Sequence, residues 1–88
     1  MSQPVELQLR YFASVREAVG TGAESWTSQA ATVAGLRDEL IARGGAWAQS
    51  LARCRAVRVA VDQVLQQDES AALRPGAEIA FFPPVTGG

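Results

Sequence analysis

The residues best suited to chemistry stand at the C-terminus, where the segment Phe81-Phe82-Pro83-Pro84-Val85-Thr86-Gly87-Gly88 ends in a carboxylate. Glycine has no Cβ, so Gly87 and Gly88 can pass through a channel too narrow for other residues. At roughly 3.3–3.6 Å per extended residue, the last four residues can carry the carboxylate about 14 Å from the body of the domain. We therefore expect a tail that is inserted into a partner, with the Gly88 carboxylate as its reactive group.

The composition excludes several other classes of function. The chain has 88 residues, which is enough for one small domain. Eight arginines, no lysine and nine carboxylates leave it nearly neutral and without a basic cluster, so we expect neither nucleic acid nor membrane as a partner. Its N-terminus does not resemble a signal peptide and no apolar run approaches the roughly 18 residues of a membrane span, so we expect a soluble cytoplasmic protein.

The first third of the chain is predicted to form two strands around a short helix. Apolar and polar residues alternate over residues 5–11, which predicts a strand with one buried face. Apolar residues at helical spacing from Phe12 onward predict a helix over residues 13–19, which Gly20 ends as its C-cap. Residues 25–27 are predicted to form a brief second strand.

The middle of the chain is predicted to hold the main helix, with Thr32 as its N-cap and its apolar residues on one face. We expect Gly44-Gly45 to end this helix, and a further helical turn or two over residues 46–53. Gly35 lies in the helix interior, where glycine costs about 1 kcal/mol relative to alanine. We therefore expect Gly35 to allow close packing of the helix on the sheet.

The last third is predicted to form a hairpin and a final strand. Alternation over residues 57–61 predicts a strand, and Asp62-Gln63 is expected to turn the chain back into residues 64–66. Proline and glycine occupy the central positions of a predicted type II turn that begins at Arg74. Alternation over residues 77–81 then predicts the last strand before the tail.

Together these elements predict an α+β domain of the β-grasp (ubiquitin-like) order, a mixed sheet with one main helix packed across it plus short helices. We expect this domain over residues 1–82 and an extended tail over residues 83–88. Ile79 and Phe81 are expected to face the core, while Phe82 lies on the opposite face and continues into the prolines. Apolar surface of this kind on a small domain marks a contact site. We therefore expect a partner to cover the sheet face and to hold the tail.

Other residues have weaker chemical potential. Cys54 is a single cysteine between two arginines, and we interpret it as a packing residue. Gly44-Gly45 is not followed by Lys-Ser or Lys-Thr, so it is not a phosphate loop, and we expect no ATP site, other cofactor or metal on this chain. Arg10 and Arg58, expected on the outward side of adjacent strands, could meet acidic groups of a partner.

The chain resembles a known family over almost its whole length. Residues 81–88, Tyr11–Gly20 and Thr32–Leu40 are similar to the C-terminus, the first strand-to-helix segment and the main helix of the small, sulfur-carrying subunits of molybdopterin synthase. These are ubiquitin-like β-grasp proteins of the molybdenum-cofactor pathway. Asp62 departs from the family pattern, which often has asparagine there, and Gly35 replaces a better helix former.

The resemblance implies a sulfur carrier rather than an enzyme. A ubiquitin-activating-type adenylyltransferase would use ATP to adenylate Gly88, and sulfur from a sulfurtransferase would convert it to a thiocarboxylate. Thr86, Gly87 and Gly88 would thread into the larger subunit of a heterotetrameric synthase. There the thiocarboxylate would supply sulfur for the dithiolene of molybdopterin, made from cyclic pyranopterin monophosphate, with the catalytic acid and base in the partner. The residues that would contact partners are Phe82, Pro83, Pro84 and Val85.

Three other hypotheses remain open. A sulfur carrier for thiamine thiazole synthesis has similar chemistry but is normally shorter and lacks the Phe-Phe-Pro-Pro run. A ubiquitin-like modifier would attach Gly88 to lysines of other proteins, because the adenylation chemistry is shared. A passive β-grasp interaction module would not depend on Gly87 or Gly88.

Overall fold

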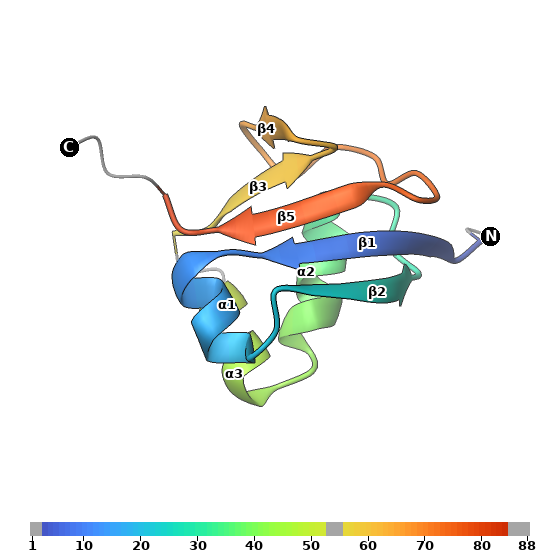
Figure 1. Ribbon diagram of the computed structural model, residues 1–88. Coiled ribbons are helices and arrows are strands. Elements are labelled where there is room, and N and C mark those ends of the chain that lie inside the picture. Colours follow the sequence, from blue (N-terminus) through green and yellow to red (C-terminus); the bar gives the residue numbers. More distant parts are fainter. Residues whose placement is uncertain (1–2, 53–55, 85–88) are drawn as a thin grey trace.

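A mixed five-stranded sheet carries three helices on one of its faces (Figure 1). The structure is a computed structural model that describes residues 3–52 and 56–84. Along the chain the elements are β1 (Val5–Tyr11), α1 (Ala13–Val19), β2 (Ala23–Ser28), α2 (Val33–Ile41), α3 (Gly45–Leu51), β3 (Arg58–Val61), β4 (Val64–Gln66) and β5 (Glu78–Phe82).

The last strand lies in the middle of the sheet, whose strand order is β2-β1-β5-β3-β4. Strands β1 and β5 are parallel, with Leu9 opposite Ile79, and the other neighbouring pairs are antiparallel. Strand β5 is therefore hydrogen-bonded on both sides, and the predicted α+β architecture with a mixed sheet is confirmed.

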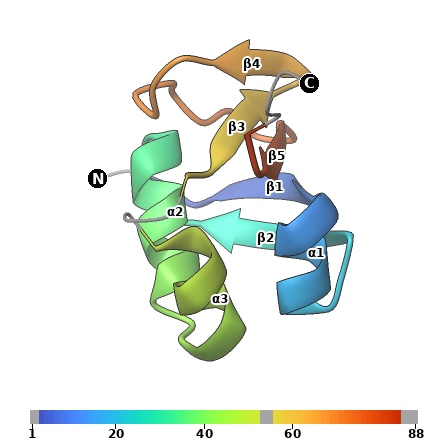
Figure 2. The same cartoon turned by 90° about the vertical axis from the view of Figure 1, so that its left-hand side faces the viewer.

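The core fills the space between the inner face of the sheet and the helices (Figure 2). Alternation along β1 buries Leu7, Leu9 and Tyr11, as the period-two pattern predicts. Helix α2 lies across this face and buries three apolar side chains there. The buried cluster consists of Leu7, Leu9, Tyr11, Val15, Val33, Leu36, Leu40, Leu51, Val59, Ala77, Ile79 and Phe81.

The predicted helix ends and turns are largely confirmed. The Thr32 hydroxyl oxygen accepts a hydrogen bond from the Gly35 N–H at 3.4 Å, which caps α2. Gly20 closes α1 with a φ of 83°, and Gly76 has a φ of 81° in the turn before β5. The second strand is longer than predicted. The expectation that Gly44-Gly45 ends the main helix is wrong, because α2 ends at Ile41 with Ala42 as its C-cap, and Gly44 is instead the N-cap of α3.

Two other expectations about these segments are wrong. Phe12 is not part of the helical face, because its backbone is extended at the N-cap of α1 and its side chain is 48% exposed. Gly35 does allow a close approach, but not to the sheet. A Cβ built at Gly35 would lie 2.8 Å from the Ala30 Cβ, so the contact is with the loop that precedes α2.

A buried arginine joins α2 to the end of α3. The Arg37 guanidinium donates to the carbonyl oxygens of Leu51 and Ala52, each at 2.7 Å, and forms an ion pair with Glu69 at 2.6 Å. A buried charge is tolerated only when its donors are satisfied in this way. Arg37 therefore fixes α3 against the main helix, and it ties both helices to the segment after β4.

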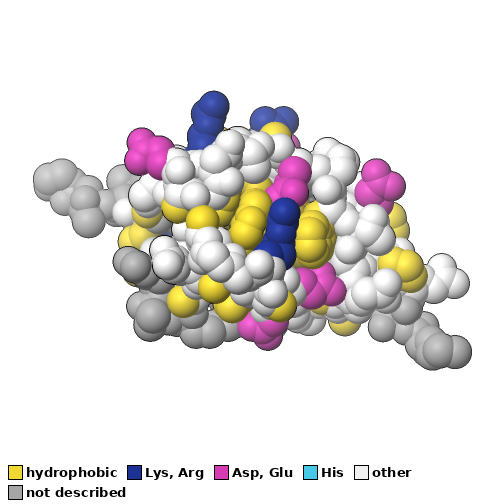
Figure 3. Space-filling model, turned by 90° about the horizontal axis from the view of Figure 1, so that it is seen from below, with side chains coloured by type: hydrophobic (Ala, Val, Ile, Leu, Met, Phe, Trp, Pro, Cys, Tyr) yellow, Lys and Arg dark blue, Asp and Glu magenta, His cyan; other side chains and the backbone are white. Residues whose placement is uncertain are grey.

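A second polar cluster lies between β2 and α3. Acidic, basic and apolar side chains lie together on the helical side of the molecule (Figure 3). The Tyr11 hydroxyl donates to Glu24 at 2.7 Å, and Arg43 forms an ion pair with the same carboxylate at 2.9 Å. The Arg43 guanidinium carbon also lies 4.8 Å from the Trp26 ring centroid and 3.7 Å from that of Trp47. Arg43 thus links the β2 edge of the sheet to α3.

This environment makes the phenol of Tyr11 resistant to ionisation. Burial raises its pKa above the ordinary value, and the hydrogen bond to Glu24 and the negative charge of Glu24 raise it further. The pKa of Tyr11 is higher in the folded chain than in the unfolded one. The neutral phenol therefore contributes fully to the free energy of unfolding below about pH 10, and this contribution is lost as the pH rises further.

We expect the folded chain to show no tyrosinate absorbance at pH values where free tyrosine is ionised, and to gain it only on unfolding. Tyr11 is the single tyrosine of the chain, so the absorbance reports this residue alone. The stability of the Tyr11→Phe variant should depend much less on pH over the same range. A reversible tyrosinate titration near pH 10 with unchanged circular dichroism would contradict the described packing.

Candidate functional site

The tail leaves the domain at the end of the sheet where the central strand β5 terminates. Strands β1 and β5 end there and β3 begins there (Figure 1). The N–H of Phe12 donates to the Phe81 carbonyl at 3.1 Å, which ties the start of α1 to the end of β5. Beyond β5, Pro83 is half-buried and Pro84 is exposed. The prolines therefore begin where the packed structure stops.

The remaining candidate residues of the tail, Val85, Thr86, Gly87 and Gly88, lie outside the described residues, as does Cys54. Their expected roles remain predictions. The structure places the base of the tail and the surfaces that surround it.

The two phenylalanines that precede the prolines have opposite environments, as predicted. Phe81 is fully buried in the core, where its ring stacks on Tyr11 at a centroid distance of 6.1 Å. Phe82 is only partly covered and pairs with Arg58 across the strands on the outward face. One residue thus holds the last strand in the domain, and the next offers apolar surface beside the tail.

The outward face of the sheet carries a continuous apolar strip next to Phe82. Ala80 pairs with Ala60 on β3, and Ala60 pairs with Leu65 on β4, so these three side chains form one row across the strands. The alanines are nearly covered by their neighbours, whereas Leu65 is 50% exposed. We call Phe82, Ala80, Ala60 and Leu65 the outer apolar patch.

Leu65 and Phe12 are two exposed apolar residues that the sequence interpretation did not assign to the site. Leu65 belongs to a strand of three residues, which is too short for alternation to show which side chain faces outward. Phe12 was placed on a helical face by its spacing. Only the register of β3, β4 and β5 and the position of the α1 N-cap bring these residues toward the tail.

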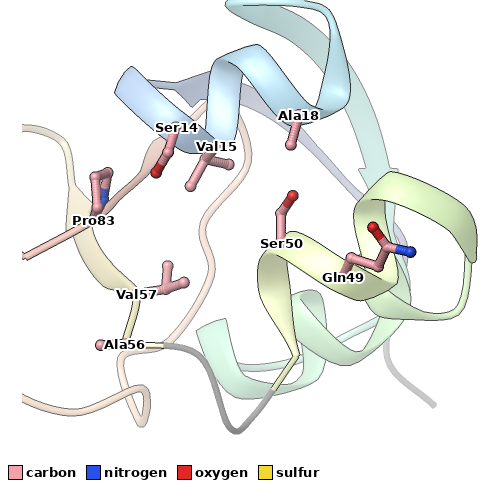
Figure 4. A pocket seen from close by; sticks show the side chains of 8 residues that line it. All are labelled: Ser14, Val15, Ala18, Gln49, Ser50, Ala56, Val57 and Pro83. Carbon is pink, nitrogen blue, oxygen red and sulfur yellow. The ribbon is translucent and has the colours of Figure 1, made fainter.

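A hollow of about 360 Å³ lies on the other side of the tail base, between α1 and α3 (Figure 4). Pro83 forms one wall, and small side chains such as Ser14, Ala18 and Ser50 leave the space open. Its full lining is Ser14, Val15, Ala18, Gln49, Ser50, Ala56, Val57 and Pro83. The base of the tail therefore has the outer apolar patch on one side and a concave surface on the other.

The described residues contain no cluster of three or more histidine, cysteine or acidic side chains that could hold a metal ion. Within the same residues, no helix has the length and apolar character needed to cross a bilayer.

The family of the chain follows from comparison with known proteins. The sequence model of the ThiS family matches residues 9–88, which includes the tail, the end of β1 and all the later strands. The chain belongs to the ThiS family. This ThiS-family chain is 42% identical over 82 residues to the molybdopterin synthase sulfur carrier subunit of Haemophilus influenzae, an alignment that covers 93% of the chain and 99% of the relative. The resemblance found in the sequence is confirmed.

Solved structures show the same fold as this ThiS-family chain. A Haloferax volcanii protein solved in solution is 32% identical and superposes with a TM-score of 0.80, covering 97% of the chain and 88% of that protein. A chain of the complex of subunits 1 and 2 of the molybdopterin-converting factor from Helicobacter pylori is 23% identical, with a TM-score of 0.65 and coverage of 96% and 100%. At that identity the second match supports the fold alone.

The opposite environments of Phe81 and Phe82 lead to a direct test. We expect Phe81→Ala to lower the free energy of unfolding by about 3–5 kcal/mol, because it leaves a cavity in the core. Phe82→Ala should lower it by about 1 kcal/mol or less, because its ring is already partly in water. Urea unfolding of both variants measures the difference, and equal losses would contradict the assigned faces.

Proposed function

We propose that the chain is the sulfur carrier of molybdopterin synthesis, and that Gly88 carries the sulfur as a C-terminal thiocarboxylate. The observation that carries this proposal is the near full-length similarity to a molybdopterin synthase sulfur carrier subunit, and the ThiS-family match includes the tail. In support, a strand bonded on both sides leads directly into that tail. We propose residues 1–82 as the folded domain and residues 83–88 as the extended tail.

Activation is needed because a carboxylate is a poor electrophile. In the proposed sequence, an adenylyltransferase of the ubiquitin-activating type binds the domain, and the Gly88 carboxylate attacks ATP and releases pyrophosphate. A sulfurtransferase then supplies sulfur at the oxidation level of sulfide, which displaces AMP from the adenylate and leaves the thiocarboxylate. ATP is thus consumed by the activating enzyme, and the carrier itself binds no cofactor. We propose that these steps take place in the cytoplasm.

In the proposed synthase, the large subunit receives the tail and holds the catalytic acid and base. Thr86, Gly87 and Gly88 thread into its active site, where successive carriers supply the two sulfurs of the dithiolene. A channel that positions and desolvates the thiocarboxylate beside cyclic pyranopterin monophosphate contributes through proximity. The carrier is a non-catalytic subunit, and the assembly is a heterotetramer.

The surface around the tail base supplies the rest of the contact. The outer apolar patch adjoins the tail through Phe82, and its exposed apolar surface, at Leu65 and Phe82, is typical of a contact site. Partly exposed aromatic residues such as Phe12 and Phe82 can anchor an interface at small entropic cost. We propose that partners cover the patch while they hold Pro83, Pro84 and Val85.

A variant that ends at Thr86 tests the function. We expect it to unfold at the same temperature as the full chain, because Gly87 and Gly88 follow the packed strand. With large subunit, activating enzyme, ATP, sulfur donor and cyclic pyranopterin monophosphate present, it should form no molybdopterin. Gln29→Ala, an exposed substitution elsewhere, should leave product formation unchanged and serves as the control.

Product formation by the shortened chain would contradict the proposal and favour a passive interaction module. Lysine-linked conjugates of the full chain in a lysate, with no molybdopterin formed, would favour the protein modifier.

A further inference from the structure

The positively charged side chains of this protein are all arginines. Its 88 residues include eight arginines, no lysine and no histidine. A guanidinium stays protonated in proteins and does not act as a nucleophile, whereas a lysine amine is in equilibrium with a neutral form that attacks activated carbonyl groups. The chain therefore has cationic side chains but no side-chain amine that an activated carboxyl group could acylate.

Two exposed arginines flank the strand that leads into the tail. Arg10 lies on β1 and Arg58 on β3, and the expectation that these strands are adjacent is wrong, because β5 separates them. Arg58 is directly opposite Phe82, the last residue of β5. Since neighbouring strands are about 5 Å apart, Arg58 lies beside the start of the tail.

The activated end of the tail can reach position 58. Gly88 is six residues beyond Phe82, so the extended chain between them spans at most roughly 20 Å, and a shorter return path is open to it. A lysine at position 58 would also lie beside the outer apolar patch, and partial desolvation lowers the pKa of an amine. An amine there would therefore be well placed to intercept the activated Gly88, in its own chain or in a second carrier.

The other nucleophiles that the structure describes are poorly suited to attack. The Tyr11 hydroxyl is buried and donates a hydrogen bond to Glu24 at 2.7 Å, so no phenolate is exposed. Serine and threonine hydroxyls are weak nucleophiles unless a neighbouring base activates them, and the chain has no histidine to do so. The main-chain amine precedes β1, which begins at the end of the sheet opposite to the one where the parallel strand β5 terminates.

We propose that arginine in place of lysine, above all at Arg58 beside the tail, determines which acceptor receives the activated Gly88 acyl group. The carrier cannot acylate itself or a second copy of itself, so the acyl group is kept for sulfur. This inference rests on the proposed function and adds to it the acceptor specificity of the activated tail.

The reaction that Arg58 prevents is the formation of an amide. A neutral lysine amine would attack the Gly88 carbonyl carbon of the adenylate, a carbon–nitrogen bond would form, and the bond to AMP would break. AMP would leave with the electron pair of that bond, and the nitrogen would release a proton. The product could not be converted to a thiocarboxylate, because an amide has a much poorer leaving group than an adenylate.

The test is activation of the full chain without a sulfur donor. Arg58→Lys keeps the positive charge and adds an amine, whereas the control Arg58→Gln changes the same position and adds none. Each carrier is incubated in excess over activating enzyme with ATP. Hydroxylamine is then added to cleave adenylates and thioesters, including any thioester on Cys54, before the intact mass is measured.

Arg58→Lys should form amides, seen as one chain that has lost one water or as two joined chains that have lost one water between them. Their amount should exceed that of the wild-type chain and of Arg58→Gln by about tenfold or more, because the amine is held near the tail. Arg74 is exposed in the turn before β5, at the other end of that strand. Arg74→Lys should therefore give fewer amides, and these only between two chains.

Amides in the wild-type chain at the level of Arg58→Lys would overturn the proposal. An Arg58→Lys chain that forms no amide, although it melts at the wild-type temperature and releases pyrophosphate, would overturn it as well. Failure of the wild-type chain to release pyrophosphate would instead overturn the proposed function, and this inference with it.

Discussion

The parallel pairing of β1 with β5 is the constraint on which the rest of this molecule depends. It places the last strand in the centre of the sheet, with β3 bonded on its other side, so the segment before the tail is held by two ladders. Both parallel strands terminate at the same end of the sheet, where α1 begins and where Pro83 and Pro84 follow β5. A long tail attached to a frayed terminal strand would have no defined direction, whereas here its origin is fixed by the core.

The side chains on the two faces of β5 have different roles, one in stability and the other in recognition. Inward side chains such as Ile79 and Phe81 complete the core, and outward ones such as Ala80 and Phe82 form a surface that contributes less to folding. The buried guanidinium of Arg37 fixes α3 to the main helix on the covered face. A partner can therefore cover the outward face and hold the tail without disturbing the packing that keeps the carrier folded.

Much of the fold follows from local patterns in the sequence, because alternation, helical spacing and caps are properties of neighbouring residues. Such patterns predicted the strand over residues 5–11, the cap at Thr32 and the opposite faces of Phe81 and Phe82. The order of the strands was not, because it depends on pairing between distant segments. For that reason the sequence interpretation placed β1 beside β3 and did not assign Leu65 to the surface beside Phe82.

The proposed sulfur-carrying role of Gly88 can be tested by measuring the intact mass of the full chain after incubation with activating enzyme, ATP and sulfur donor. The expected result is the replacement of one oxygen by sulfur, located at Gly88 by fragmentation and also formed in a Cys54→Ser variant. An unchanged mass, or sulfur found only on Cys54, would contradict the proposed role of Gly88.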